Sequence, residues 1–360
     1  MNFEIRKCSG KDVASVKNFL VEFSDNQNRI NPKNKGDEQI NWEWLFLRES
    51  SQSRTAVAAF NENDEVIGHY GISPINYVTP KGEIELGIIC KLAITEVYRR
   101  SMLFLQISLE LFKLAKEDNI THYAGLANRP GLTEFHQAMG FVNKGAIPVL
   151  FAPVSISSLG DDLLPRMLSL ILSPALMVLN FLFRVYLKFF FIKKVNSIKV
   201  VEISTVDIKQ ELNNILSSSH LYYADRSPKN LSWRFFQNSS RKYVMFGAYD
   251  SGLKGYVVLR RMKMRKLNGV AIVDIVADSD NPFILKSLIK SAYEFAIEQE
   301  ASCLAALLSD KHISEVMLKL GFFKTKESFD LVARYPNKNN SMSYSKLKDW
   351  YITWFDHDTA

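Results

Sequence analysis

Apolar and polar residues alternate along some segments of the chain and follow a helical period along others. In the first part, the pattern predicts strands over 3–6, 84–94, 121–126 and 146–151, and helices over 11–23, 101–117 and 131–139. A hairpin with a polar turn at 61–65 lies ahead of the strand over 84–94. Antiparallel strands followed by a strand–helix–strand unit are typical of a mixed-sheet α/β domain.

The same order of elements recurs in the second part of the chain. Strands are expected over 200–203, 269–277, 303–308 and 331–335, with a hairpin over 243–259, and helices over 208–216, 282–299 and 313–320. Three landmarks of the first part, Trp44, Gly68 and Gly140, match Trp233, Gly255 and Gly321 at separations of 189, 187 and 181 positions. The preserved order indicates a duplication. We expect domains over 1–153 and 199–360, joined by a connector over 154–198.

The connector contains the most apolar segment of the chain, residues 163–192. Five polar residues interrupt it at intervals of about four and form one stripe on a helix: Ser169, Ser173, Asn180, Arg184 and Lys188. Pro174 predicts a kink. Three arrangements remain open: burial between domains, a peripheral membrane contact parallel to the bilayer, and a membrane-spanning helix. Two cations in its last third disfavour the spanning helix, and the flanking Lys and Arg suit a bilayer surface.

Composition sets the broad class of protein. The chain has 360 residues, is 47% hydrophobic and carries a net charge of +7, so it can bury cores and favours anionic partners. Cys8, Cys90 and Cys303 are widely spaced, which indicates neither a disulfide framework nor a metal site. The first residues, MNFEIRKC, favour a strand rather than a secretory signal. We therefore expect a cytoplasmic protein, with membrane association through 163–192 as the variant.

Three stretches carry a resemblance to a known family. They are LAITEVYRR at 92–100, which begins at the end of an expected strand, Asn128, which follows the next expected strand, and FHQAMGF at 135–141, where an expected helix ends. The chain resembles the GNAT acyltransferase superfamily over nearly the whole of both halves. The resemblance implies a mixed α/β fold with two GNAT-like domains in tandem. It also implies that acetyl-CoA or another acyl-CoA is the donor substrate.

The resemblance also implies where the donor would bind. Leu92, Ala93 and Ile94 would face the acyl-pantetheine arm, and the phosphate turn would consist of Arg99, Arg100, Ser101, Met102, Leu103 and Phe104. Asn128 would bond the pantetheine arm, or cap the helix that follows it. The family usually has small residues where Met102 and Phe104 stand. Residues 278–285 of the second half contain no glycine or arginine, so the first half is the expected donor site.

Acyl transfer to an amine needs a base and an acid. Glu83 and Glu85 share one face of a strand and are the candidate bases, unless they form a solvated strand end. His136 stands where the family often has a tyrosine that protonates the leaving thiolate, and a packed histidine is the alternative. Packing is expected for His69, Tyr70, Trp44 and Trp233. The sequence DHD at 356–358 is expected in a solvated tail.

Three functions remain open. The first is an acyl-CoA-dependent N-acyltransferase acting on an amine of a small molecule or of a surface-polysaccharide amino sugar. The amino sugar is suggested by the closing residues 350–356, which are similar to the tails of some bacterial tandem GNAT-like proteins. The second is an aminoacyl-tRNA-dependent transferase, and the third is an inactive binding or scaffold protein.

The basic run 260–266 before Asn268 and Gly269, a predicted hairpin turn, is either an anion site or a charged strand edge. The modest net charge makes nucleic acid an unexpected partner.

Overall fold

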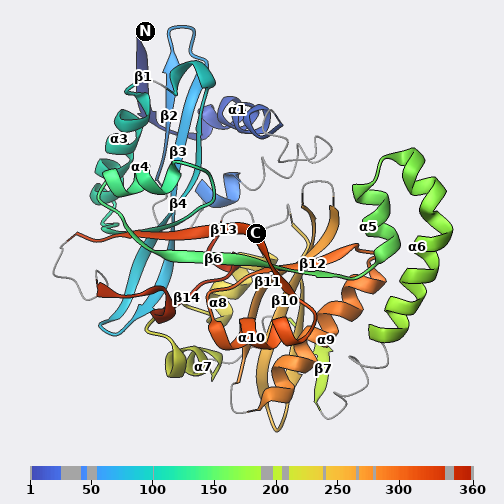
Figure 1. The fold of residues 1–360 in the computed structure, drawn as a ribbon. Helices are drawn as coiled ribbons and strands as arrows, with labels where there is room; N and C mark the ends of the chain where they lie inside the picture. The colour runs from blue at the N-terminus through green and yellow to red at the C-terminus, as the bar shows by residue number, and fades with distance from the viewer. Residues whose placement is uncertain are drawn as a thin grey trace. The chain divides into compact units, whose positions relative to one another are not determined.

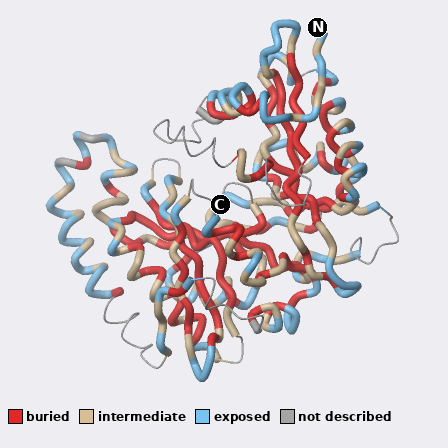
Figure 2. Tube along the Cα trace, turned by 180° about the vertical axis from the view of Figure 1, so that it is seen from behind, coloured by how far each residue is buried: buried red, intermediate tan, exposed pale blue. Residues whose placement is uncertain are grey.

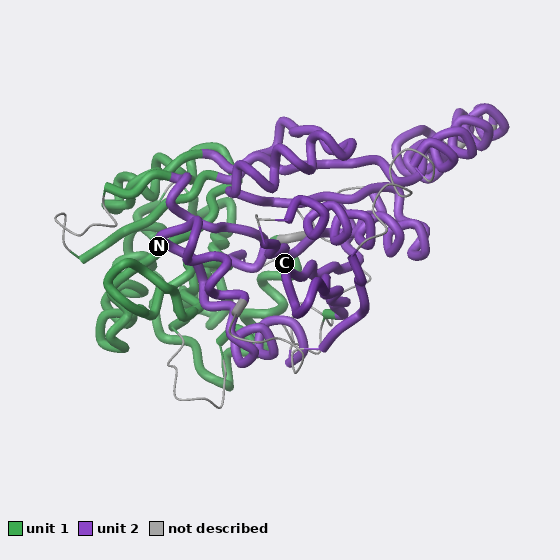
Figure 3. The backbone as a smooth tube through the Cα atoms, turned by 90° about the horizontal axis from the view of Figure 1, so that it is seen from below, with its two compact units in different colours: residues 1–145, 238–241, 330–346 green, residues 146–237, 242–329, 347–360 purple. Residues whose placement is uncertain are grey.

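The computed structural model describes most of the chain in detail. The described residues are 2–25, 42–46, 55–99, 101–187, 198–204, 211–237, 241–264, 267–278, 281–336 and 344–357. The chain forms two compact units (Figure 3). Unit 1 consists of residues 1–145, 238–241 and 330–346, and unit 2 of 146–237, 242–329 and 347–360.

Unit 1 is built on a mixed β-sheet (Figure 1). Its strands are β1 (Phe3–Lys7), β2 (Thr55–Asn61), β3 (Val66–Thr79), β4 (Gly82–Ile94), β5 (His122–Ala127) and the last five residues of β13 (Phe323–Arg334). They pair in the order β1-β2-β3-β4-β5-β13. The β4–β5 pair is parallel and the other pairs are antiparallel. The helices of this unit include α1 (Val13–Asp25), α3 (Leu103–Glu117), α4 (Leu132–Ala138) and a short helix over 42–46.

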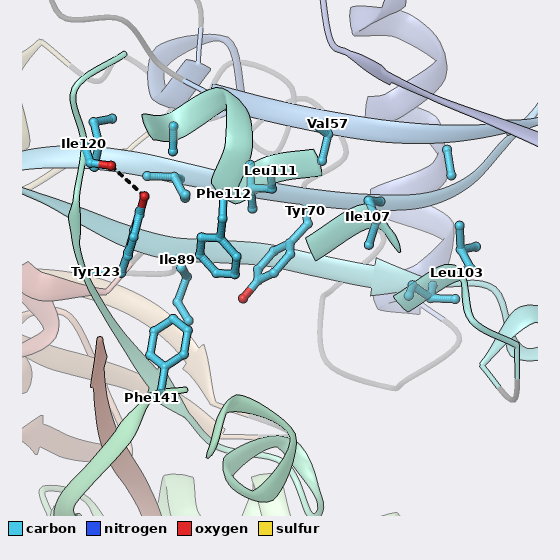
Figure 4. Close-up of a cluster of buried hydrophobic side chains, with 14 of the residues drawn as sticks. Val57, Tyr70, Ile89, Leu103, Ile107, Leu111, Phe112, Ile120, Tyr123 and Phe141 are labelled. Carbon is cyan, nitrogen blue, oxygen red and sulfur yellow. Dashed lines mark hydrogen bonds between the residues drawn. The ribbon is translucent and has the colours of Figure 1, made fainter. Parts of the chain in front are cut away.

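Both faces of the unit 1 sheet are covered by apolar side chains, because residues of each strand alternate between the two faces. On one face, Val57 of β2 and Ile89 of β4 pack with Ile107 and Leu111 of α3 (Figure 4). On the other face, Ala58 and Cys90 pack with residues of α1 and with the helix over 42–46. The central strands are therefore buried on both sides, as Figure 2 shows.

Unit 2 repeats this plan. Its strands are β6 (Val142–Pro153), β7 (Lys199–Glu202), β9 (Val244–Tyr249), β10 (Leu253–Met264), β11 (Leu267–Ala277) and β12 (Cys303–Leu307), paired in the order β6-β12-β11-β10-β9-β7. Here β11 and β12 form the parallel pair. A further short pair joins β8 (Tyr222–Ala224) to β14 (Trp350–Tyr351). The helices are α5 (Ile156–Leu163), α6 (Arg166–Tyr186), α7 (Glu211–Ser219), α8 (Pro228–Leu231), α9 (Pro282–Glu298) and α10 (Lys311–Lys319).

Each unit contains one strand segment that is distant in sequence from the rest of that unit's sheet. The end of β13, which comes late in the sequence, pairs with β5 of unit 1, where Leu331 lies opposite Leu126. The end of β6, which comes early, pairs with β12 of unit 2, where Phe151 lies opposite Ala305. The mixed α/β class is confirmed. The domain limits at 153 and 199 stay a prediction, since each unit draws strands from both parts of the sequence.

Backbone geometry supports the duplication. Gly140 follows α4 with φ of 86°, and Gly321 follows α10 with the same φ of 86°. In each case the next residue, Phe141 or Phe322, donates its backbone N–H to a carbonyl of the preceding helix. A left-handed residue after a helix favours glycine, because other side chains meet the backbone there. The same ending therefore recurs at matched positions.

Two details of the sequence prediction are wrong. Asn268 and Gly269 do not form a turn: they lie within β11, opposite Lys263 and Met262. The backbone N–H and the side-chain amide of Asn268 both donate to the carboxylate of Asp162 in α5, and these bonds hold Asn268 in the strand. The second error is the start of β13, which begins eight residues before the predicted 331 because its first part is exposed and lacks a regular apolar alternation. Arg261 and Lys263 of the basic run are both exposed and lie two positions apart in β10, and the rest of the run extends beyond the described residues.

The connector contains two helices in place of one. Helix α5 ends at Leu163 and α6 begins at Arg166, after Pro165. Pro174 lies inside α6, and the helix continues through it. Residues 188–192 of the predicted segment lie outside the described residues. Within the described residues, no helix combines the length and the hydropathy that crossing a bilayer requires.

Candidate active site

Strands β4 and β5 separate partway along their length. They pair only at Leu86–His122, Gly87–Tyr123 and Ile88–Ala124, although β4 continues to Ile94 and β5 to Ala127. We call the region between 89–94 and 125–127 the β4–β5 split. Ile89 lies at its narrow end against Gly125, where a Cβ atom would come within 2.3 Å of Ile89 Cγ1. The split presents one backbone edge of β4, which can pair with an extended chain that contains amide groups.

A bulge in β4 lies beside the split. His69 of β3 pairs with Ala93 and Gly71 pairs with Cys90, so Lys91 and Leu92 together oppose a single residue of β3. Lys91 has φ of 54°, in the left-handed region that is unfavourable for a lysine. A bulge re-aims the backbone groups of its strand and is common next to active sites.

Two buried side chains hold this bulge in place. His69 is fully buried, and its Nδ1 lies 2.8 Å from the carbonyl oxygen of Lys91. Trp42 Nε1 donates to His69 Nε2 over 3.0 Å. Because indole N–H only donates and the carbonyl only accepts, the imidazole must carry its proton on Nδ1 and be neutral. Burial lowers the pKa of His69 to about 4, in agreement with a neutral ring. We call these contacts the Trp42–His69 brace.

The turn after β4 leads into the N-terminus of α3. Ser101 Oγ donates to the carbonyl of Tyr98 and accepts from the amide of Leu103, so its hydroxyl serves the turn itself. The backbone N–H of Gln106 donates to the carbonyl oxygen of Met102. The backbone N–H groups of Phe104 and Leu105 lie in the first turn, where a helix has no acceptor of its own. Such a helix start attracts anions.

Met102 and Phe104, the two large residues of the turn, have different surroundings. Met102 is 61% exposed. Phe104 packs against the ring of Phe135 in α4, with ring centroids 3.4 Å apart. Leu103 is buried in the core beside Ile107. Arg100 lies outside the described residues.

Two arginines lie near the carboxyl ends of β4 and β5. Arg99 follows β4, and its Nε donates to Ile94 O over 3.2 Å. The guanidinium groups of Arg99 and Arg129 lie 5.6 and 5.4 Å from the ring centroid of Phe23 in α1. Ligands of α/β proteins commonly bind outside the carboxyl ends of parallel strands. Arg129 is a residue that the sequence interpretation missed, although it follows Asn128 directly.

The three strand residues predicted to face the donor occupy the split. Leu92 and Ile94 pack toward the α3 face, and Ala93 is buried toward α1. Asn128 is exposed after the end of β5. It does not cap α4, which begins at Leu132 with Gly131 as its N-cap. The capping alternative is therefore wrong, and contact between Asn128 and a donor stays a prediction.

The candidate bases lie at the other end of β4. Glu83 is exposed opposite Val78, and Glu85 is half-buried opposite Asn76, both ahead of the first pair with β5. Six residues separate Glu85 from Lys91, which corresponds to about 20 Å along a strand. Their role as bases stays a prediction.

His136 belongs to the core of unit 1. Its Nε2 lies 3.1 Å from Tyr70 Oη, and its ring contacts Phe141 at 5.2 Å between centroids. Burial lowers the pKa of His136 to about 4 and raises the pKa of Tyr70 above its usual range. Both groups are therefore uncharged at pH 7. A proton for a leaving thiolate would have to come from a neutral pair, and this role of His136 also stays a prediction.

Unit 2 has a matching split that its own chain fills. Strand β11 pairs with β12 only as far as Ile272–Ala306, yet it continues to Ala277. The C-terminal segment lies beyond that point: Thr353 bridges Leu308, and Tyr351 Oη donates to Ile275 O. The Tyr351 side chain thus occupies a backbone carbonyl of β11 beyond the last pair of this strand with β12.

A buried charge network fixes this segment. Asp274 of β11 accepts hydrogen bonds from Arg226, Tyr256 and Thr353, at distances from 2.6 to 3.3 Å. Asp356 lies 3.5 Å from the guanidinium of Arg226. The adjacent carboxylates raise the pKa of Arg226 despite its burial. The prediction that Asp356 lies in a solvated tail is therefore wrong.

Comparisons with known proteins agree with this geometry. No family model matches the chain, and no curated protein matches it either. Among solved structures, Saccharomyces cerevisiae N-myristoyltransferase with bound myristoyl-CoA is similar with a TM-score of 0.67 at 12% identity, over 97% of this chain and 88% of the yeast chain. A GCN5-related N-acetyltransferase from Anabaena variabilis gives a TM-score of 0.60 at 13% identity, over 93% of this chain and 73% of that one. The chain therefore shares the fold of these GNAT-like structures.

Proposed function

We propose that the protein is an acyl-CoA-dependent N-acyltransferase whose donor site lies in unit 1. The observation that carries the proposal is the β4–β5 split, with a braced bulge on one side and the start of α3 at its end. An acyl-pantetheine chain offers amides that can pair with β4 where this strand no longer pairs with β5. The pyrophosphate of the coenzyme would meet the helix start and the two arginines, Arg99 and Arg129.

The donor would bind once per chain. In unit 2, Tyr351 and Thr353 already contact β11 and β12 where the strands part, and removing them would leave the Arg226–Asp274 network open. The acceptor is proposed to be an amine of a small molecule or of a surface-polysaccharide amino sugar. The support for this acceptor is the resemblance of the sequence to GNAT-like proteins.

Titration calorimetry with acetyl-CoA and with myristoyl-CoA tests the donor site directly. We expect one molecule per chain. A double variant, Arg99→Ala with Arg129→Ala, should bind at least about tenfold more weakly, because each charge-assisted contact contributes about 1.5–3 kcal/mol. Lys113→Ala, a lysine on α3 that is 65% exposed, is the matched control and should bind as the wild type does.

Turnover is then measured as thiol released from acyl-CoA with a panel of amines, including glucosamine and a nucleotide-linked amino sugar. The arginine variant should raise KM for the donor more than it lowers kcat, since both residues are proposed to bind rather than to react. Glu85→Gln and His136→Gln test the two predicted catalytic roles. An absence of acyl-CoA binding by the wild type would refute the proposal and favour an inactive scaffold.

A further inference from the structure

Helix α6 presents its apolar side to solvent. Met167, Ile171 and Phe181 are 78, 71 and 67% exposed. The other large apolar residues on the exposed part of the helix are Leu168, Leu172, Met177, Val178, Leu179, Leu182, Val185 and Tyr186. Figure 2 shows the same helix as an exposed element at the edge of unit 2. We call this set of residues the α6 apolar face. Contiguous apolar faces of this extent are rare on proteins that have no partner for them.

Two polar residues of α6, Ser169 and Asn180, form hydrogen bonds with α5. Ser169 is buried and its hydroxyl donates to Asp161, and Asn180 Oδ1 accepts from the amide of Ile156 over 2.9 Å. Leu176 lies against Gly160, where an added Cβ would come within 2.5 Å of it. Ser169 and Asn180 of the predicted polar stripe therefore face α5, and the arrangement is the reverse of an ordinary surface helix.

Helix α5 fixes this pair of helices to unit 2. Asp162 accepts hydrogen bonds from the backbone and side-chain amides of Asn268 in β11, at 3.0 and 3.2 Å. The face of α6 that points outward is consequently set by these contacts. Rotation of α6 to bury its apolar residues would break the bonds of Ser169 and Asn180.

The charge of this part of the chain is of one sign. Residues 163–201 contain six Lys and Arg and no Asp or Glu. In α6 itself, Arg184 is exposed in the last turn. Apolar residues that point outward and cations without anions suit an anionic lipid surface, where the apolar face enters the acyl boundary and the cations meet headgroups. A second copy of this chain would bring the same positive charge and would be repelled.

We propose that the α6 apolar face binds the surface of an anionic phospholipid bilayer, with α6 lying parallel to the membrane. At about 1.5 Å per residue, its 21 residues extend for roughly 31 Å along the surface. The helix does not need to cross the membrane, which agrees with the absence of a spanning helix among the described residues. The proposal is independent of whether unit 1 binds an acyl-CoA.

Vesicle flotation of the full chain tests this proposal. The vesicles contain phosphatidylcholine alone, or phosphatidylcholine with about 30 mol% phosphatidylglycerol, at low and high NaCl concentration. We expect the chain to float with the anionic vesicles, at least about tenfold more than with the neutral ones, and less so at high salt. The double variant Ile171→Asp with Phe181→Asp should lose this binding at least about tenfold, and it should fold, since both residues are exposed.

A matched control separates the face from general hydrophobicity. Leu109→Asp with Leu221→Asp replaces two residues that are also exposed but lie outside α6, and it should float as the wild type does. Circular dichroism establishes that both double variants are folded. Two results would overturn the proposal: equal flotation of the two double variants, or a wild-type dimer without lipid that the α6 variant converts to a monomer.

Discussion

Replacing His69 with leucine should weaken both the fold of unit 1 and its donor site. Leucine has a similar volume, so the main loss is the pair of hydrogen bonds in the Trp42–His69 brace. Trp42 Nε1–H and Lys91 O would then be buried without these partners. Each unsatisfied group costs about 1–3 kcal/mol, so we expect the free energy of unfolding to fall by about 2–6 kcal/mol.

A double-variant cycle identifies the origin of this loss. Trp42→Phe removes the indole donor, so it should cost less in the His69→Leu background than in the wild type, by about 1–2 kcal/mol. Denaturant unfolding followed by circular dichroism measures all four proteins. Acyl-CoA affinity of the folded variants, measured by calorimetry, should fall as well, because Lys91 would leave its unfavourable backbone conformation once its carbonyl is released.

The control is His122→Leu, which changes a half-buried histidine at the start of β5, outside the brace. We expect a loss of less than about 1 kcal/mol and unchanged acyl-CoA binding, as for an ordinary partly exposed position. If His69→Leu unfolded at the same denaturant concentration as the wild type and bound acyl-CoA equally well, the brace would not hold the bulge.

Three further predictions concern the stability of the two units. Asp274→Ala should lower the free energy of unfolding by about 3–5 kcal/mol, because it removes one of the two carboxylates beside the buried charge of Arg226. Chemical denaturation measures this loss, and a loss below about 1 kcal/mol would contradict the prediction. Burial lowers the pKa of His69 and His136 to about 4, whereas both histidines titrate near pH 6.5 in the unfolded chain. The free energy of unfolding should therefore have its full value above pH 6.5 and fall by about 3 kcal/mol per histidine as the pH drops to 4. Urea titrations across this range test the sign, and a stability that rises on acidification would refute it. Gly140→Ala, at φ of 86°, should cost about 1–2 kcal/mol in thermal unfolding, and an unchanged transition would show that the backbone relaxes there.

Local patterns of the sequence predicted the central elements of both units. Strand β4 and helix α3 agree with the predicted ranges to within two residues, because their apolar periods match the faces that they bury. Where a strand is exposed, as in the first part of β13, side-chain alternation is weak, and the sequence carried little signal. The pattern thus reports burial more directly than it reports backbone pairing.

Features that depend on distant residues could not be predicted. The role of His69 depends on Trp42, 27 residues earlier, and on a carbonyl 22 residues later. Likewise, Asp356 is buried because Arg226 lies beside it, although 130 positions separate the two in sequence. Residue types alone indicated a solvated tail there. Both cases need the tertiary structure, because a buried polar group is explained by its partner and not by its neighbours in the chain.

The late strand of unit 1 has a consequence for synthesis of the protein. Strand β5, which forms one side of the proposed donor site, pairs along its other edge with residues 330–334. A ribosome that has completed β5 at Ala127 must add about 200 residues before these arrive, which takes roughly 10–40 s at 5–20 residues per second. During that time β5 has an open edge. Unit 1 can therefore be completed only after residues 330–334 have been made, although most of its residues are made well before them.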